Sequence, residues 1–395
     1  MIVIVLQRIL LLTLAAPLLS ACGILGGDDD EALQPKELVG FQETLPVDRI
    51  WSGSVGDGSE FLRLALAPAG LGDRVFTASR DGVVTAWDAA SGQRLWRTEL
   101  ETRLSAGPGA GSDTVVVAGS DGDVVALRDE DGTVIWRTDV ARESLARPIV
   151  ADDSVVVYTI DGSLRVLSRF NGNERWSMSE QLPPLTLRGS SSPVVVNRTV
   201  VVGFDNGRLI ATGLLDGAPR WEIVLSPPTG RSDLERLADV DGHIAAVGQD
   251  IYATAYQGRL AALAAESGQA LWSREISTHV GVSADAENVY LATDTGEVIA
   301  LDRTTGAEEW RSDVLLRRKP TVPVPFGDSV VVGDFEGYVH FFDKAGGTLV
   351  ARRRVGKSML SGAPVVHRDR LYVQSESGRL EAFVIDPPEV EEATP

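Results

Sequence analysis

The chain has 395 residues, of which 44% are hydrophobic, and a formal net charge of −19. So acidic a chain is not expected to bind nucleic acid, and anionic lipid headgroups would repel it. Its single cysteine excludes an intrachain disulfide.

The N-terminus has the pattern of a secretion signal. Residues 1–19 carry one basic residue, Arg8, and the apolar stretch 9–19 is too short for a convincing membrane-spanning helix. It ends in a Leu-Ser-Ala-Cys sequence at Cys22, which resembles a bacterial lipoprotein signal. The resemblance implies removal of residues 1–21 and acylation of Cys22, and Gly23 after it implies the periplasmic face of the outer membrane. The alternative is an ordinary buried cysteine.

Residues 22–45 are predicted to be a flexible tether, because they contain two glycines followed by the acidic run 28–31. The C-terminal residues 387–395 are predicted to be a disordered acidic tail. Between them, residues 46–386 contain a repeat.

Each repeat has a dipeptide ending in glycine, then about ten residues, a second glycine and, four residues later, a tryptophan. The dipeptides are Asp81-Gly82, Asp121-Gly122, Asp161-Gly162, Asn206-Gly207, Gln257-Gly258, Thr295-Gly296, Glu336-Gly337 and Ser377-Gly378. The tryptophans are Trp96, Trp136, Trp176, Trp221, Trp272 and Trp310, and Trp51 precedes the first repeat. A period of this length, made of short strands and glycine turns, is typical of a β-propeller.

The spacing has a physical basis. The first glycine supplies the positive φ of a tight hairpin, and β-branched runs such as 115–117 and 200–202 suit buried strands. We therefore predict an all-β fold, an eight-bladed propeller of four-stranded blades. The strand around Trp51 completes the last blade, and the seven tryptophans dock one blade on the next. Ala351 stands where a tryptophan is expected, which should weaken one of these contacts.

Two neighbouring connections are longer than the others. From Trp96 to Trp310 the tryptophans are 40, 40, 45, 51 and 38 residues apart. The extra residues fall in 180–193 and 226–241, on one face of the ring, where insertions commonly form a binding surface. The leucines Leu182, Leu185 and Leu187, with Arg188, suggest a protein contact. Alternatively, the leucines fold back under the loop, and Asp239 and Asp241 are turn residues.

No catalytic or metal-binding motif is present. The four histidines, among them His340, have no metal-ligand spacing, and they are expected to be isolated surface or strand residues. Most aspartates occupy turn positions. The basic clusters 317–319 and 352–354 are expected to be solvated, with a local docking patch as the alternative. The sequence therefore predicts a non-catalytic protein with no cofactor and no metal.

Together these features resemble the BamB family, the lipoprotein subunits of the β-barrel assembly machinery of Gram-negative outer membranes. The resemblance rests on the lipoprotein signal, on the unit Ala300–Trp310, and on the loops 185–189 and 236–241. It implies a scaffold that docks the POTRA domains of BamA and supports the insertion of outer-membrane proteins. Direct contact with their unfolded precursors is left open. The residues implied as contacts are Leu185, Leu187, Arg188, Arg236, Asp239 and Asp241.

Two other functions remain open at this point. A quinoprotein dehydrogenase has similar repeats and tryptophans. The repeats of such enzymes are less compact than those of this chain, however, and many of the enzymes have a vicinal cysteine pair. Another envelope scaffold, or a ligand-binding propeller lipoprotein, would share the signal and the repeat.

Overall fold

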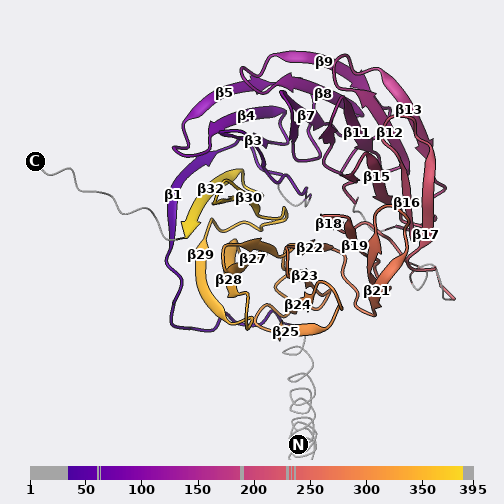
Figure 1. Cartoon of the computed structure of the whole chain (residues 1–395). Coiled ribbons are helices and arrows are strands. Elements are labelled where there is room, and N and C mark those ends of the chain that lie inside the picture. Colours follow the sequence, from indigo (N-terminus) through magenta and orange to yellow (C-terminus); the bar gives the residue numbers. More distant parts are fainter. Residues whose placement is uncertain are drawn as a thin grey trace, which may run out of the picture. The chain divides into compact units, whose positions relative to one another are not determined.

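The computed structural model describes residues 34–59, 62, 64–186, 191–227, 231, 232, 234 and 237–385. The predicted signal, residues 22–33 of the tether with Cys22 among them, Leu187, Arg188, Arg236 and the C-terminal tail lie outside the described residues. The unit that begins at Leu38 holds eight antiparallel four-stranded sheets in the described part of the chain. They form the blades of a propeller, which confirms the predicted fold (Figure 1).

In each blade the strands follow in order from the inside of the ring to the rim. Blades 1 to 4 consist of β2 (Ala69–Leu71), β3 (Arg74–Ala78), β4 (Val83–Asp88) and β5 (Arg94–Glu99); β6 (Gly109–Gly111), β7 (Thr114–Ala118), β8 (Asp123–Arg128) and β9 (Val134–Asp139); β10 (Ile149–Ala151), β11 (Ser154–Tyr158), β12 (Ser163–Ser168) and β13 (Glu174–Ser179); and β14 (Val194–Val196), β15 (Thr199–Gly203), β16 (Arg208–Gly213) and β17 (Pro219–Val224).

The second half of the ring repeats this plan. Blades 5 to 8 consist of β18 (Ala245–Val247), β19 (Asp250–Thr254), β20 (Leu260–Ala264) and β21 (Ala270–Arg274); β22 (Val282–Ala284), β23 (Asn288–Ala292), β24 (Val298–Asp302) and β25 (Glu308–Ser312); β26 (Val324–Phe326), β27 (Ser329–Gly333), β28 (Tyr338–Asp343) and β29 (Leu349–Arg354); and β30 (Val365–His367), β31 (Arg370–Gln374), β32 (Arg379–Ile385) and β1 (Val47–Ser54).

Burial along the strands follows their place in the blade. The second strands β7, β11, β15 and β27 are buried at every residue, because neighbouring blades cover both of their faces. Their Val-rich sequences fit such a doubly covered position. The outer strands, such as β5 and β9, instead alternate exposed and covered residues. Each blade therefore shares its core with its neighbours.

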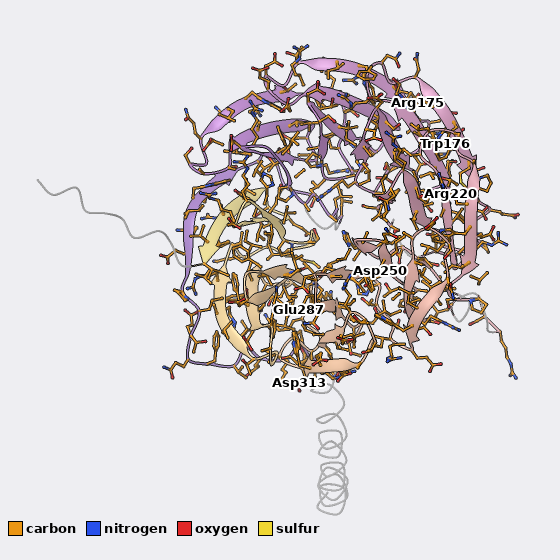
Figure 2. All side chains as sticks on the ribbon, viewed as in Figure 1. Arg175, Trp176, Arg220, Asp250, Glu287 and Asp313 are labelled. Atoms are coloured by element: carbon orange, nitrogen blue, oxygen red, sulfur yellow. The ribbon has the colours of Figure 1, made fainter. Side chains whose placement is uncertain are left out.

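Tryptophan and glycine join consecutive blades. Trp96 donates its Nε1–H to the carbonyl of Asp129 in the next blade at 2.8 Å. Its ring lies against Gly132, where a Cβ would be 2.5 Å from the indole and where φ is +72°. Only glycine tolerates both the conformation and the contact. The same contact joins Trp51 to Gly92, Trp136 to Gly172, Trp176 to Gly217, Trp221 to Gly268, Trp272 to Gly306 and Trp310 to Gly347. Figure 2 shows Trp176 on the rim.

The N-terminal strand closes the ring. β1 pairs with β32 in antiparallel register from Val47 opposite Ile385 to Ser54 opposite Arg379. Trp51 of this strand donates to the carbonyl of Ala89 in blade 1 at 3.1 Å and stacks on Trp87. The first and last strands of the ring are thereby joined, as the sequence predicts.

The joint between blades 7 and 8 is filled differently. Ala351 on β29 is fully buried in a cluster that includes Val47, with Leu45 and Ile385 packed against it. Apolar side chains from the chain before β1 therefore occupy this joint. The expectation that Ala351 simply weakens a contact is corrected, because a small residue leaves room for Leu45 and Val47.

Candidate docking surface

Two long connections lie on the same face of the ring. The first connector, residues 180–193, joins β13 to β14, and the second connector, residues 225–244, joins β17 to β18. Because the strands of a blade alternate in direction, this face also carries every turn between the second and third strands. The turn 204–207 of blade 4 lies between the two connectors. For comparison, residues 275–281 suffice to join β21 to β22.

The first connector is fixed at its beginning and exposed further on. The Glu180 amide donates to the Gly162 carbonyl at 3.0 Å, and the Asn206 side chain donates to the Glu180 carboxylate at 3.1 Å. Leu182 packs against the core shared by blades 3 and 4. It therefore folds back under the loop, which is the alternative that the sequence left open. Leu185 remains 43% exposed.

The second connector is fixed at both ends. Its first residue, Leu225, donates to Gly207 at 2.8 Å, and Val240 donates to Phe204 at 3.2 Å. The carbonyl of Asp239 accepts from the Tyr256 amide at 2.9 Å, which ties the connector to blade 5. Between these points Leu234 is 64% exposed. Leu185 and Leu234 are thus exposed on connectors that hydrogen bonds hold at the start of the first and at both ends of the second.

Three buried carboxylates lie close together at the two connectors. Asp205 belongs to the turn between β15 and β16, and Asp239 and Asp241 belong to the second connector; all three are buried. Burial, then the charge of Asp239, raises the pKa of Asp205 and of Asp241 to about 7. A hydrogen bond from Thr186 of the first connector partly offsets the shift at Asp205. This cluster therefore links the two connectors.

The structure places Asp239 and Asp241 in the interior, although the sequence suggested them as contact residues. Asp239 has no exposed area, and Asp241 is 8% exposed. In this conformation both side chains are covered by protein, so a contact with another protein through them requires the second connector to move. Of the sequence-derived contact residues that the structure describes, Leu185 alone lies at the surface.

Sequence reasoning missed several residues of this face. Asp205 and Thr186 join the carboxylate cluster, and Leu234 is the most exposed large apolar residue of the described chain. His279 contacts Asp294 through Nδ1 at 2.7 Å and lowers the pKa of Asp241, which places it beside the second connector. His279 is distant in sequence from Asp241, so no local sequence pattern indicates that the two lie close together.

A third long connection was also missed. Residues 55–68 join β1 to β2 on the same face, and Leu62 there is 37% exposed. The signal was present, because Trp51 and Trp96 are 45 residues apart, the same interval as Trp176 and Trp221.

The described residues contain no group of three or more His, Cys, Asp or Glu side chains arranged to hold a metal ion. Asp205, Asp239 and Asp241 are thus a cluster of like charges without metal-site geometry. Within the same described ranges, no helix is both long and apolar enough to cross a membrane.

Fold and surface together define a class of protein: an eight-bladed propeller with tryptophan-docked repeats and long connectors on one face. The family model for "Outer membrane protein assembly factor BamB" matches residues 80–312 and 300–386. The chain belongs to the BamB family.

Individual relatives agree. The BamB of Alkalilimnicola ehrlichii is 49% identical over 377 residues, which cover 95% of this chain and 97% of that protein. The BamB of Pseudomonas aeruginosa is 42% identical over 94% of this chain and 98% of its own length.

Solved structures give the same fold. The crystal structure of BamB from Moraxella catarrhalis superposes with a TM-score of 0.78 at 27% identity, covering 86% of this chain and all of that one. A quinohemoprotein alcohol dehydrogenase from Comamonas testosteroni gives a TM-score of 0.67 at 12% identity, covering 86% of this chain and 76% of that one. This second likeness is one of fold alone.

Proposed function

We propose that the chain is a non-catalytic scaffold lipoprotein of the machinery that assembles outer-membrane β-barrel proteins. Membership of a family of assembly factors supports this function. The observation that carries it is the pair of adjacent connectors, which present Leu185 and Leu234 from ends held by hydrogen bonds. Exposed apolar residues on a rigid support favour binding to another protein, since little ordering entropy is lost.

The proposed partner is a BamA-like barrel protein, which the two connectors would meet through its periplasmic POTRA domains. Leu185 and Leu234 would be apolar contacts, with Leu187, Arg188 and Arg236 beside them in the sequence. Asp205, Asp239 and Asp241 would support the connectors from below. This division of roles follows from the exposure of the leucines and the burial of the carboxylates.

The proposed location is the periplasmic face of the outer membrane, with Cys22 as the lipid anchor. Several acyl chains hold a protein at a membrane stably, because each buried CH₂ contributes about 0.8 kcal/mol. The part of the predicted tether 22–45 that precedes Leu38 would link the anchor to the propeller as a flexible acidic segment.

Purification of the mature protein from membranes in mild detergent tests this function. We expect recovery of a barrel protein with POTRA domains in stoichiometric amount. Recovery of the propeller without such a protein, under conditions that preserve other envelope complexes, would contradict the proposal. A bound quinone with Ca²⁺ would instead favour the dehydrogenase.

A further inference from the structure

The chain just before β1 lies along the rim of blade 7. The amides of Thr44 and Leu45 donate to the carbonyl of Val350 on β29 at 3.0 and 3.2 Å. The amide of Arg352 donates to the Glu43 carboxylate at 3.3 Å. We call residues 38–46 the strap; in Figure 1 it is the indigo segment that continues from β1 past β29.

Two arginines of β29 hold the strap. Arg353 donates through Nη1 to both carboxylate oxygens of Glu43 at 2.8 and 3.0 Å, and through Nε to the carbonyl of Val47 at 2.8 Å. Arg352 donates to the carbonyl of Val39 at 3.1 Å, and its guanidinium lies 5.1 Å from the centre of the Phe41 ring. The charge pattern of the sequence predicts that these arginines are solvated, and their contacts with the strap correct that prediction.

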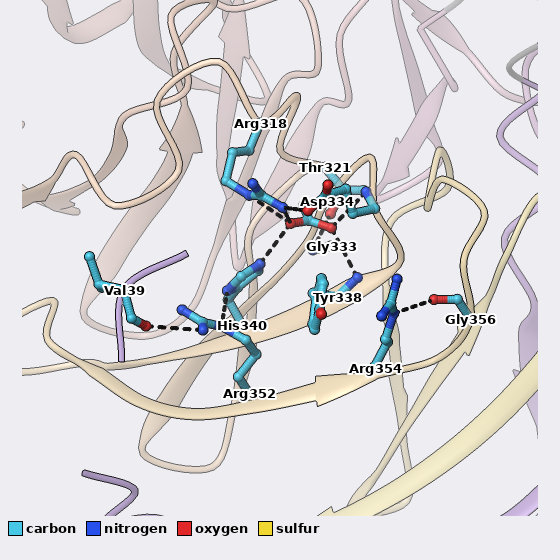
Figure 3. Close-up of polar contacts among 11 residues, drawn as sticks. Val39, Arg318, Thr321, Gly333, Asp334, Tyr338, His340, Arg352, Arg354 and Gly356 are labelled. Atoms are coloured by element: carbon cyan, nitrogen blue, oxygen red, sulfur yellow. Dashed lines mark hydrogen bonds and ion pairs between the residues drawn. The ribbon is translucent and has the colours of Figure 1, made fainter. Parts of the chain in front are cut away.

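Arg352 is itself positioned from inside the blade. Its Nε donates to Nδ1 of His340 at 3.2 Å, and Nε2 of His340 donates to Asp334 at 3.0 Å. Asp334 also accepts two hydrogen bonds from Arg318, at 2.9 and 2.8 Å. Figure 3 shows this chain of contacts from Arg318 to Val39. His340, Asp334 and Arg318 are all buried, against the expectation of a solvated cluster and an isolated histidine.

The strap also fills the joint that lacks a tryptophan. Leu45 and Val47 pack with Ala351, whereas the other seven joints are held by an indole on a glycine. Blade 8 has no turn to carry such a glycine, since its third strand β32 and its outer strand β1 come from opposite ends of the ring's sequence. The chain that leads into β1 therefore takes the place of that contact.

We propose that residues 38–46 are a latched strap that closes the ring at blades 7 and 8 in place of an eighth tryptophan. In this device Arg352 is the latch, and His340 is the positioning residue that orients it. The segment that follows the proposed lipid anchor is thus the same segment that completes the ring. The contacts of the strap do not depend on the proposed function. Its effect on the reach of the propeller does, because the lipid anchor at Cys22 is part of that proposal.

The latch sets how far the propeller can move from its anchor. Between Cys22 and Leu38 the chain spans about 55 Å at most, at roughly 3.3–3.6 Å per residue. Release of the strap as far as Val47 adds about 30 Å by the same measure. The connectors would then reach a wider region from the same attachment point.

The latch depends on a neutral His340, because Nδ1 must accept a hydrogen bond from Arg352. The groups facing the ring are Asp334 from the turn before β28, Arg318 from the connection 313–323, Arg352 from β29 and Tyr338 on β28. Burial lowers the pKa of His340; Asp334 opposes this shift, and the charges of Arg352 and Arg318 add to it. Since the folded pKa lies below the ordinary value of about 6.5, the latched state loses stability as pH falls below about 6.5.

Hydrogen exchange on the mature, full-length protein in detergent tests the latch. In Arg352→Gln, exchange of the Thr44 and Leu45 amides should be about tenfold faster or more, the effect of losing one hydrogen bond to a charged group. Arg354→Gln is the matched control, because Arg354 follows on the same strand but donates to Gly356 and not to the strap. Its strap should exchange within about twofold of the parent protein. Equal strap exchange in Arg352→Gln and the parent would overturn the proposal.

The role of His340 is tested by the pH profile of the same exchange, corrected for the intrinsic rate. The parent strap should lose protection as the pH falls below about 6.5, whereas His340→Gln, which keeps a donor and an acceptor, should give a flat profile. A flat profile in the parent would overturn the positioning role. If Arg352→Gln does not fold, Phe41→Leu on the strap serves in its place, because it removes the contact of the Phe41 ring with the Arg352 guanidinium. Faster strap exchange is again expected, and unchanged exchange would overturn the proposal.

Two further readings on the same samples separate this proposal from the proposed function. Membrane retention and recovery of the barrel partner report on the anchor and the docking surface. Strap exchange reports on the latch alone, so either proposal can fail while the other stands.

Discussion

The indole of Trp310 lies on Gly347 of the next blade, and its Nε1–H donates to the carbonyl of Lys344 at 2.7 Å. A Cβ at Gly347 would stand 2.3 Å from the indole. Seven such pairs of tryptophan and glycine run around the ring in the described chain, so the blades are joined by one repeated contact. This contact holds together the blades from which the connectors extend.

Gly347→Ala should destabilise the ring by about 2–5 kcal/mol, because left-handed strain and a clash with Trp310 act together. Gly72 is the matched control: its φ is +58°, against +64° at Gly347, but a Cβ there would meet nothing within 4 Å. Gly72→Ala should therefore cost only the strain, about 1–2 kcal/mol. Urea unfolding of both variants measures the difference, and equal costs would show that the indole contact is unimportant.

Ala351→Trp should destabilise the protein by about 1–3 kcal/mol, because the joint already holds Leu45 and Val47 and has no room for an indole. If this joint merely lacked its tryptophan, the substitution would instead increase stability. Thermal unfolding of the mature protein distinguishes these outcomes. Trp136→Ala, which removes a complete joint, should cost about 3–5 kcal/mol and sets the scale.

The carboxylate cluster predicts a pH dependence of the connectors. The pKa values of Asp205 and Asp241 are raised to about 7, so their contribution to stability is full below about pH 4 and is lost as pH rises to about 7. Asp205→Asn should therefore stabilise the protein at pH 8 by on the order of 1–3 kcal/mol and change little at pH 4 or below. Denaturant midpoints at the two pH values test this. In the parent protein these aspartates lower stability as pH rises, whereas His340 lowers it as pH falls. The two effects overlap in the parent, so the Asn variant is needed to separate them.

Cys22→Ala should release the protein from membranes without unfolding it, because the anchor is proposed to be the acyl chains on Cys22. Fractionation of cells at high salt measures the release, and circular dichroism of the soluble protein checks the fold. Retention of the folded variant in the membrane fraction would argue against lipid anchoring.

The repeat was predictable because its chemistry is local. A glycine at a positive φ, followed four residues later by tryptophan, specifies a turn and an outer strand within one short segment. When eight copies close into a ring, both faces of strands such as β7 and β15 are buried between neighbouring blades. The closing strand around Trp51 followed from a tryptophan that had no turn of its own.

The buried polar clusters were not predictable because their members come from distant segments. Asp205 meets Asp241 only when blade 4 and the second connector are in place. Glu43 meets Arg353 across 310 residues of sequence. Arg352 and His340 are separated by 12 residues, but neither lies in a motif. Charge pattern alone favoured solvated positions for all of them, since most charged residues are solvated.

The docking surface is tested most directly by apolar-to-acidic substitutions on opposite faces of the ring. Leu185 and Leu234 lie on the connectors, whereas Leu215 is similarly exposed in the turn between β16 and β17, at the opposite end of its blade. Recovery of the barrel partner in mild detergent should fall at least tenfold for Leu185→Asp combined with Leu234→Asp, the effect of about 1.4 kcal/mol. It should be unchanged for Leu215→Asp. Equal recovery with all of these folded variants would contradict the assignment of the connectors as the docking surface.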